Sequence, residues 1–312
     1  MHAPVIAGVD GSAESLAAAE WAAREAERRD RPLRLLHARN RHPRDKVGEP
    51  SPELPASFQQ GTPVAAQRPP ARRVLRRAEE RIRGAVPGVR IAGEQVEGPA
   101  TAALLTAAEQ AEMLVLGSRG LSGFTGFLVG SVALAVVAQA TGPVVLVRAE
   151  ERAEDEHVPA EDGSASTRTG YRDVVLGLDV NDPSDEVIEF AFAAARLRQA
   201  RLRVVHAWQP PSAFGLGPGD IALVKDPYRA EEWQGFLSAV LQVWRDKYPE
   251  VEVLETVVRE KAATALVRAA SGAGLLVVGR QLADRPVPAR TGPVTHAAVH
   301  HVSCPVAVVP HH

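Results

Sequence analysis

Short apolar segments alternate with amphipathic segments along the chain. In the first half, apolar runs predict strands near residues 5–9, 33–38, 90–96, 112–117 and 144–148. Between them, apolar residues recur at helical spacing and predict helices near residues 13–29, 70–86, 99–110 and 131–140. Strands that alternate with helices indicate βαβ units, whose right-handed crossovers place helices on both faces of a mostly parallel sheet.

The second half of the chain repeats the first. Residues 5–10 read VIAGVD and residues 174–179 read VVLGLD, so that Asp179 corresponds to Asp10. The later segment LVLG ends at Gly117, and its counterpart LVVG ends at Gly279. A repeat of this length indicates a duplicated domain. We therefore expect two tandem α/β domains, residues 1–149 and 171–312, each built on a five-stranded sheet.

The segment between the copies, residues 150–170, is rich in charge and then in small polar residues, which predicts a solvated linker. The formal net charge of −2 gives no reason to expect nucleic acid as a partner. A lone cysteine, Cys304, excludes a disulfide within the chain and favours a reducing compartment. The N-terminus has no signal-peptide pattern, and the uncharged stretch 127–147 is broken by glycine and proline. We expect a cytoplasmic protein without a membrane partner.

In such folds, ligands bind at the carboxyl ends of the strands. The loop after the strand at 112–117 is rich in glycine, and a helix follows it. Its glycines permit positive φ angles and a close approach of the backbone to an anion, while Arg119 could add a positive charge. Gly130 and Ser131 stand at the start of the helix, where free amides favour phosphate. A tight or flexible turn is the alternative, but the placement between strand and helix favours phosphate binding.

Asp10 follows the first strand at the same predicted edge. A carboxylate at this place can accept hydrogen bonds from ribose hydroxyls. The alternative is that Asp10 only begins a turn with Gly11. Together with the glycine loop, Asp10 favours a nucleotide ligand.

The spacing Gly117-x2-Gly120-x9-Gly130-Ser131 resembles the G-2x-G-9x-G-(S/T) signature of ATP-binding universal stress proteins. The VIAGVDGS opening, LLHA and GPVVLV also resemble that family, and the resemblance covers both halves. It implies a flavodoxin-like or Rossmann-like fold, ATP with Mg²⁺ held by the phosphates, and dimer contacts through the last strand. It also implies that Asp10 contacts the ribose or adenosine and that the backbone near Gly8 and Ala38 borders the adenine. The ribose and phosphates would be held by the loop and helix start, for which the candidates are Gly117, Arg119, Gly120, Gly123, Gly130, Ser131 and the amide of Val132.

The second half departs from this signature. Leu282 stands where the first half has Gly120, and Pro293 stands where it has Ser131. Leucine disfavours positive φ, and proline lacks both the amide hydrogen and the hydroxyl group. We expect the second domain to bind ATP poorly and to act as a structural partner in an intrachain pseudo-dimer. A homodimer of the whole chain is also an open possibility.

The remaining candidates are histidines and a proline-rich segment. His296 and His300 stand four apart on a predicted helix, which suits either a metal site or a surface pair. His37 and His206 recur at equivalent strand ends, which indicates a hydrogen-bonding role in the fold. His311 and His312 are expected to form a polar tail. Residues 40–69 contain six prolines and are expected to form a lid or an interaction segment, or to be disordered.

Three functions remain open at this point. The first is an ATP-binding stress or signalling module with little or no hydrolysis. The second is a slow ATPase or nucleotide-transferring enzyme, and the third is an interaction scaffold without nucleotide. No nucleophile and base are paired by their spacing, which favours the first.

Overall fold

The computed structural model describes residues 3–39, 71–118, 129–209, 229–282 and 291–312. The proline-rich segment 40–69 and the part of the glycine loop that holds Arg119, Gly120 and Gly123 lie outside these residues. The lid hypothesis for that segment therefore stays a prediction.

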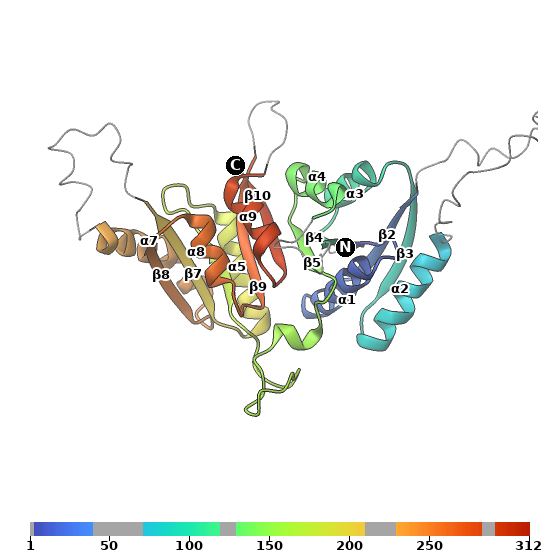
Figure 1. Ribbon diagram of the computed structural model, residues 1–312, viewed down its shortest axis with the longest axis horizontal. Helices are drawn as coiled ribbons and strands as arrows, with labels where there is room; N and C mark the ends of the chain where they lie inside the picture. Colours follow the sequence, from blue (N-terminus) through green and yellow to red (C-terminus); the bar gives the residue numbers. More distant parts are fainter. Residues whose placement is uncertain (1–2, 40–70, 119–128, 210–228, 283–290) are drawn as a thin grey trace, which may run out of the picture.

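The first half contains the alternating strands and helices expected from its apolar pattern (Figure 1). Its strands are β1 (Val5–Gly8), β2 (Leu33–Arg39), β3 (Ile91–Glu97), β4 (Met113–Ser118) and β5 (Val144–Arg148). Its helices are α1 (Ala13–Arg28), α2 (Ala71–Ala85), α3 (Ala100–Ala108) and α4 (Ser131–Gln139). The predicted elements of this half are confirmed to within about two residues at each end, which is the ordinary scatter of helix and strand limits.

The second half repeats this order. Its strands are β6 (Val174–Gly177), β7 (Leu202–Trp208), β8 (Val253–Arg259), β9 (Leu275–Gln281) and β10 (Val306–His311). Its helices are α5 (Asp185–Arg198), α7 (Arg229–Lys247), α8 (Ala262–Ala269) and α9 (Pro293–His301). None of the helices in the described parts of the chain is long and apolar enough to cross a membrane.

The strands form one continuous ten-stranded sheet in the order β3-β2-β1-β4-β5-β10-β9-β6-β7-β8. Within each half all neighbouring strands are parallel, and the halves meet where β5 and β10 pair antiparallel. The order 3-2-1-4-5 within a half is that of a Rossmann-like sheet, whereas a flavodoxin-like sheet has the order 2-1-3-4-5. The strand order therefore decides between the two expected folds, and it places the topological switch point between β1 and β4.

Helices cover both faces of the sheet, as predicted. On one face, Val5 and Ala7 of β1 pack in a core that includes Trp21 of α1 and Ile82 of α2. On the other face, Ile6 packs in a core that includes Leu104 of α3 and Val136 of α4. Because side chains alternate along a strand, one buried strand supplies both cores. Each core continues into the second half, so that the two halves share their packing.

A buried cluster of charges ties the two halves together on the face covered by α1 and α5. Glu25 of α1 accepts a hydrogen bond from Arg198 of α5 at 2.6 Å, and both side chains are 1% exposed. Burial alone would raise the pKa of Glu25, but the guanidinium groups of Arg198, Arg29 and Arg28 outweigh it and hold the pKa well below its usual range. The carboxylate of Glu25 is therefore a fixed part of the seam between the halves.

The segment between the halves is not solvated along its whole length, which corrects the linker prediction. A short 3-10 helix, η3 (Ala153–Glu156), places Glu156 against α1, where Arg24 donates to it at 2.7 Å and Arg28 also contacts it. Glu151 and His157 are buried too, while most of residues 158–170 are exposed. Burial, together with the charges of Glu156 and Asp155, raises the pKa of Glu151 to about 8. Part of the charged stretch is thus internal structure, because Glu156 pairs with arginines of α1.

Two buried arginines cross the seam in opposite directions. Arg148, at the end of β5, donates to the carbonyl oxygen of Val302 at 2.7 Å, just after α9. Arg280 in β9 donates to the carbonyl oxygen of Ala140, just after α4. A positive side chain at a helix C-terminus satisfies carbonyls that lack helical partners and complements the helix dipole. Each half therefore holds the C-terminus of the last helix of the other half.

Candidate functional site

Three parallel strands bring the predicted site residues of the first half to one edge of the sheet. Gly8 ends β1 and Asp10 follows it, Ala38 lies near the end of β2, and Gly117 lies near the end of β4. The register pairs Gly8 with Leu36 and Ala7 with Val115, so that these strand ends are level. Since β1 and β4 flank the switch point, a ligand could lie between the loops that follow them.

Asp10 is exposed at this edge and fixed in orientation by Ser12. The backbone amide of Ser12 donates to Oδ1 of Asp10 at 2.9 Å, and the Ser12 hydroxyl donates to the same oxygen at 2.6 Å. Burial raises the pKa of Asp10, but these hydrogen bonds from Ser12 outweigh it, and the net pKa lies below the usual value. Asp10 is therefore an ionised acceptor that the hydrogen bonds of Ser12 hold in place.

Helix α4 begins beside this edge, and none of the described residues caps its N-terminus. Its N-cap is Gly130, which makes no side-chain cap, and its first turn contains no acidic residue. Ser131 and Val132 are exposed, and the amides of a first helical turn have no partner within the helix. The start of α4 therefore offers free donors and the positive end of the helix dipole to an anion.

The space around Gly130 suits a ligand-binding position. Its φ of −63° and ψ of 149° are available to any residue, and a Cβ atom added there would meet nothing within 4 Å. Neither backbone strain nor packing of the described residues therefore requires glycine at this position. The open space would let a phosphate approach the amides of α4 closely.

Packing, and not a positive φ angle, explains glycine at position 117, and Gly8 is also closely packed. A Cβ atom on Gly117 would lie 2.5 Å from the carbonyl carbon of Glu14, in the backbone of α1. A Cβ atom on Gly8 would lie 2.7 Å from Leu116 and 3.0 Å from Leu104. Neither glycine has a positive φ. Gly117 thus lets α1 pack closely on the sheet, and the placement of Arg119, Gly120 and Gly123 lies outside the described residues.

Comparison with known proteins agrees with this architecture. The profile of the universal stress protein family matches the chain twice, over residues 1–148 and 170–310. The chain belongs to the universal stress protein family. Its tandem form is shared with a universal stress protein of Mycolicibacterium smegmatis, 30% identical over 281 residues that cover 88% of this chain and 86% of that protein. The universal stress protein Rv2005c of Mycobacterium tuberculosis is 29% identical and covers 97% of this chain and 96% of its own length.

A solved structure shows the same fold over the whole length. A universal stress protein from Archaeoglobus fulgidus superposes with a TM-score of 0.65 at 15% identity, and 98% of each chain is covered. At this identity, the likeness establishes the fold. The family resemblance and the tandem fold predicted from the sequence are thereby confirmed.

The second half of this universal stress protein carries an altered edge. Asp179 lies in the loop after β6 as Asp10 does after β1, and its Oδ1 accepts from the amide and side chain of Asn181, each at 3.0 Å, as Oδ1 of Asp10 does from Ser12. Pro293 is the first residue of α9, where α4 has Ser131. The N-cap of α5 is Ser184, which accepts from the amide of Val187 at 3.3 Å. Asp182 and Pro183 therefore lie in the loop before this helix.

The histidines fall into three groups. Nδ1 of His37 contacts the carbonyl oxygen of Val9 at 2.7 Å, and Nδ1 of His206 contacts that of Leu178 at 3.1 Å, which confirms their role in the fold. The rings of His296 and His300 lie 4.3 Å apart, but the described residues contain no cluster of three or more metal-ligating side chains. His311 lies at the end of β10 and lines a cavity, so the polar-tail prediction is wrong for it.

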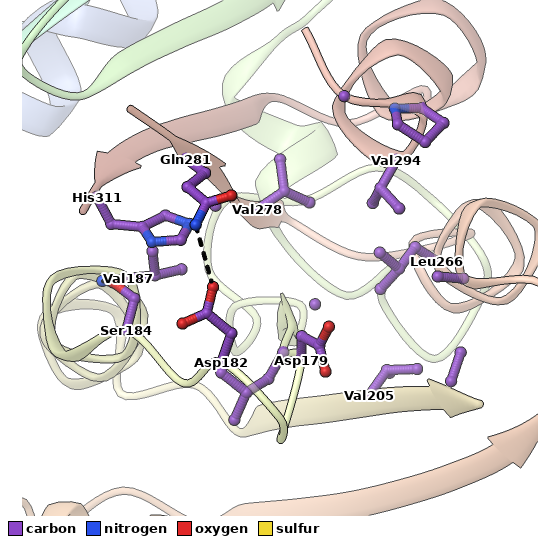
Figure 2. A pocket seen from close by; sticks show the side chains of 17 residues that line it. Asp179, Asp182, Ser184, Val187, Val205, Leu266, Val278, Gln281, Val294 and His311 are labelled. Carbon is purple, nitrogen blue, oxygen red and sulfur yellow. Dashed lines mark hydrogen bonds between the residues drawn. The ribbon is translucent and has the colours of Figure 1, made fainter. Parts of the chain in front are cut away.

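The apolar and polar pattern of the sequence does not predict this cavity. It lies at the carboxyl edge of the second half, and Asp182, Gln281 and His311 line it (Figure 2). The repeat indicates Asp179, Gly279 and Pro293 among its lining residues, since they correspond to Asp10, Gly117 and Ser131. The apolar run of β10 continues through Pro310, which places His311 at the sheet edge.

Proposed function

We propose that the chain is a nucleotide-responsive stress or signalling module whose first half binds ATP. The supporting observation is the N-terminus of α4, which none of the described residues caps, with open space at Gly130, beside the ionised carboxylate of Asp10. One end of this edge suits an anion and the other suits hydroxyl donors, which are the two polar features of a nucleotide.

In this proposal, the carboxylate of Asp10 accepts hydrogen bonds from the ribose. The amides of Ser131 and Val132, with the hydroxyl of Ser131, hold phosphate, and Mg²⁺ is carried by the phosphates. Gly8 and Ala38 border the adenine. The family signature assigns Gly120 to the same cradle, and Arg119 and Gly123 of the same loop stay candidates for it.

We further propose that binding, and not rapid hydrolysis, is the activity of this site. A general base for water works best when its pKa lies near the working pH. The pKa of Asp10 is lowered, and Oδ1 already accepts two hydrogen bonds from Ser12. Asp10 is thus suited to hold a hydroxyl group and poorly suited to take up a proton.

The second half would serve as the fixed partner of the first, in an intrachain pseudo-dimer. The antiparallel pairing of β5 with β10 and the crossing of Arg148 and Arg280 support this assignment. Arg280 holds the C-terminus of α4, the helix whose N-terminus would bind phosphate. Nucleotide binding to the first half would then affect its contacts with the second half.

Calorimetric titration of the full chain with Mg-ATP and with AMP tests the proposal. We expect ATP to bind, Asp10→Asn to weaken binding by about tenfold through loss of a charged acceptor, and the equivalent Asp179→Asn to change it little. Absence of binding would favour a nucleotide-free scaffold. Steady phosphate release over hours that Asp10→Asn abolishes would favour the ATPase alternative.

A further inference from the structure

The outer face of α7 carries an exposed apolar stripe. Of the large hydrophobic side chains that are exposed in the described parts of the chain, Val243 (69%) and Phe236 (56%) are the two most exposed. They stand seven residues apart, which is about two helical turns, so they lie on the same side of the helix. Ala239 is exposed and lies between them on that side. We call Phe236, Ala239 and Val243 the α7 stripe.

The helix that carries the α7 stripe is held firmly against the sheet. Leu237 and Leu241, on the opposite side of the helix, are fully buried in the core. Glu255 of β8 accepts hydrogen bonds from Gln234 and Ser238 of α7. Because the helix is anchored in this orientation, its stripe cannot turn inward, and a partner that covers it would remove apolar surface from water.

The corresponding helix of the first half has charge on this face. Figure 1 shows α7 and α2 at the two ends of the molecule, over the outer strands of the sheet. The turns that follow the two helices contain the same hydrogen bond, and, counted back from there, Val243 corresponds to Arg81. In the same way, Ala239 corresponds to Arg77, and both arginines are exposed. The exposed apolar face is therefore a feature of the second half and not a requirement of the fold.

Opposite charges flank the α7 stripe symmetrically. Glu232 stands four residues before Phe236, and Lys247 stands four residues after Val243, so both pairs share one midpoint on the helix. Two copies of α7 that cross antiparallel at this midpoint bring Glu232 of each copy to Lys247 of the other. Lys247 also pairs with Glu189 at 2.6 Å, but its side chain is 54% exposed and can meet a second carboxylate. Parallel copies would bring like charges together.

From this symmetry we propose that α7 joins two copies of the chain in an antiparallel homodimer. Phe236 of each copy packs against Val243 of the other, and the small side chain of Ala239 lets the helices approach closely at the crossing. The contact uses the same surface on both copies, so it closes at two. It differs from the strand contact that the family resemblance implies, because the last strands, β5 and β10, already pair within the chain.

Sedimentation velocity of the full chain over a range of concentrations tests the proposal. One pair of helices makes a small interface, so we expect a weak dimer with a dissociation constant on the order of 10–100 µM. Val243→Arg, which introduces the residue type of the first half, should raise this constant at least about tenfold, because each copy then brings a charge into the apolar contact. The matched control is Val158→Arg. Val158 is 48% exposed in the segment between the halves, and its substitution should leave the constant unchanged.

Charge reversal tests the antiparallel arrangement. Glu232→Lys and Lys247→Glu should each weaken the homodimer by roughly three- to tenfold, since like charges then meet at both ends of the contact. In an equimolar mixture of the two variants, opposite charges meet again, and the heterodimer should form about as tightly as the wild-type dimer. A merely structural role of either residue does not predict this recovery.

Three results would each overturn the proposal. The first is a wild-type chain that stays monomeric up to about 1 mM. The second is a Val243→Arg protein that dimerises as tightly as the wild type. The third is a mixture of the charge-reversed variants that stays as weak as its components. The proposed ATP site lies in the first half and takes no part in this contact, so a failure of ATP binding would leave the α7 dimer standing.

Discussion

The two halves of the chain share a scaffold and differ at the edge where ligands would bind. Both have the strand order 3-2-1-4-5, an aspartate after the first strand, and a histidine that bonds the backbone beside it. They differ in the loop before the first helix and in the first residue of the last helix, Ser131 or Pro293. The comparison teaches that the same packing forms the sheet in both copies, and we expect the few loop positions that differ to decide which ligand each half binds.

The largest effect is expected at the seam, where the halves are not equivalent. The first half supplies Glu25 and the second supplies Arg198, both fully buried. Glu25→Gln should lower the free energy of unfolding by about 3–5 kcal/mol, because it leaves Arg198 as an uncompensated buried charge. Urea denaturation measures this, with Glu79→Gln, whose partner Arg83 is exposed, as a control that should cost about 1 kcal/mol or less.

The same pair has a defined pH dependence. Since the pKa of Glu25 is lowered in the folded state, its contribution is present above the ordinary carboxyl pKa and is lost as the pH falls through the lower folded value. A loss of stability in Glu25→Gln that stayed the same from pH 7 to pH 2 would contradict this origin.

Glu151, beside the seam, should have the opposite pH dependence. Its pKa is raised to about 8 by burial and by Glu156 and Asp155, so the folded state keeps a proton that the unfolded chain has released. The free energy of unfolding of the wild type should therefore fall as the pH rises from 5 to 8. Over that range, the free energy of unfolding of Glu151→Gln relative to the wild type should grow by about 3 kcal/mol. Denaturation at the two pH values measures it, and an advantage that does not change with pH would show that Glu151 is already ionised.

The difference between Ser131 and Pro293 can be transferred from one half to the other. Ser131→Pro should weaken ATP binding by roughly 10–100-fold, because it removes an amide and a hydroxyl that would bond phosphate. The fold should tolerate it, since proline is well accepted at the first helical position and the ψ of 149° at Gly130 suits a residue before proline. Ser131→Ala, which keeps the amide, should lose only part of the affinity in the same calorimetric titration. Equal losses in the two variants would mean that the amide plays no part.

The smallest effects are expected at Gly117 and Gly130, the two signature glycines that the structure describes. Substitution of one should affect mainly stability, and substitution of the other mainly ATP binding. Gly117→Ala should destabilise the fold by about 1–3 kcal/mol, because its Cβ atom would overlap the backbone of α1. Gly130→Ala should change stability by only a few tenths of a kcal/mol and should weaken ATP binding. Thermal unfolding and calorimetry on both variants test this, and a Gly130→Ala protein with unchanged ATP affinity would remove Gly130 from the site.

The repeat, the strands and both helix layers could be predicted from the sequence because apolar periodicity reports burial directly. His37 and His206 were interpreted correctly because the same residue recurs at equivalent strand ends. Glu156 was misjudged as solvated, since its burial depends on arginines of α1 that lie about 130 residues away in sequence. His311 and Asp182 were missed as cavity residues because only the tertiary fold brings the end of β10 beside the loop after β6.

The number of ATP molecules held by one intact chain tests the central claim most directly. Native mass spectrometry of the full chain with Mg-ATP should show one ATP per chain, none in Ser131→Pro, and one in Asp179→Asn. Leu282→Gly combined with Pro293→Ser restores two signature positions of the second half and should move the count toward two. Two ATP molecules on the wild-type chain, or one that persists in Ser131→Pro and is lost in Asp179→Asn, would contradict the assignment of ATP to the first half.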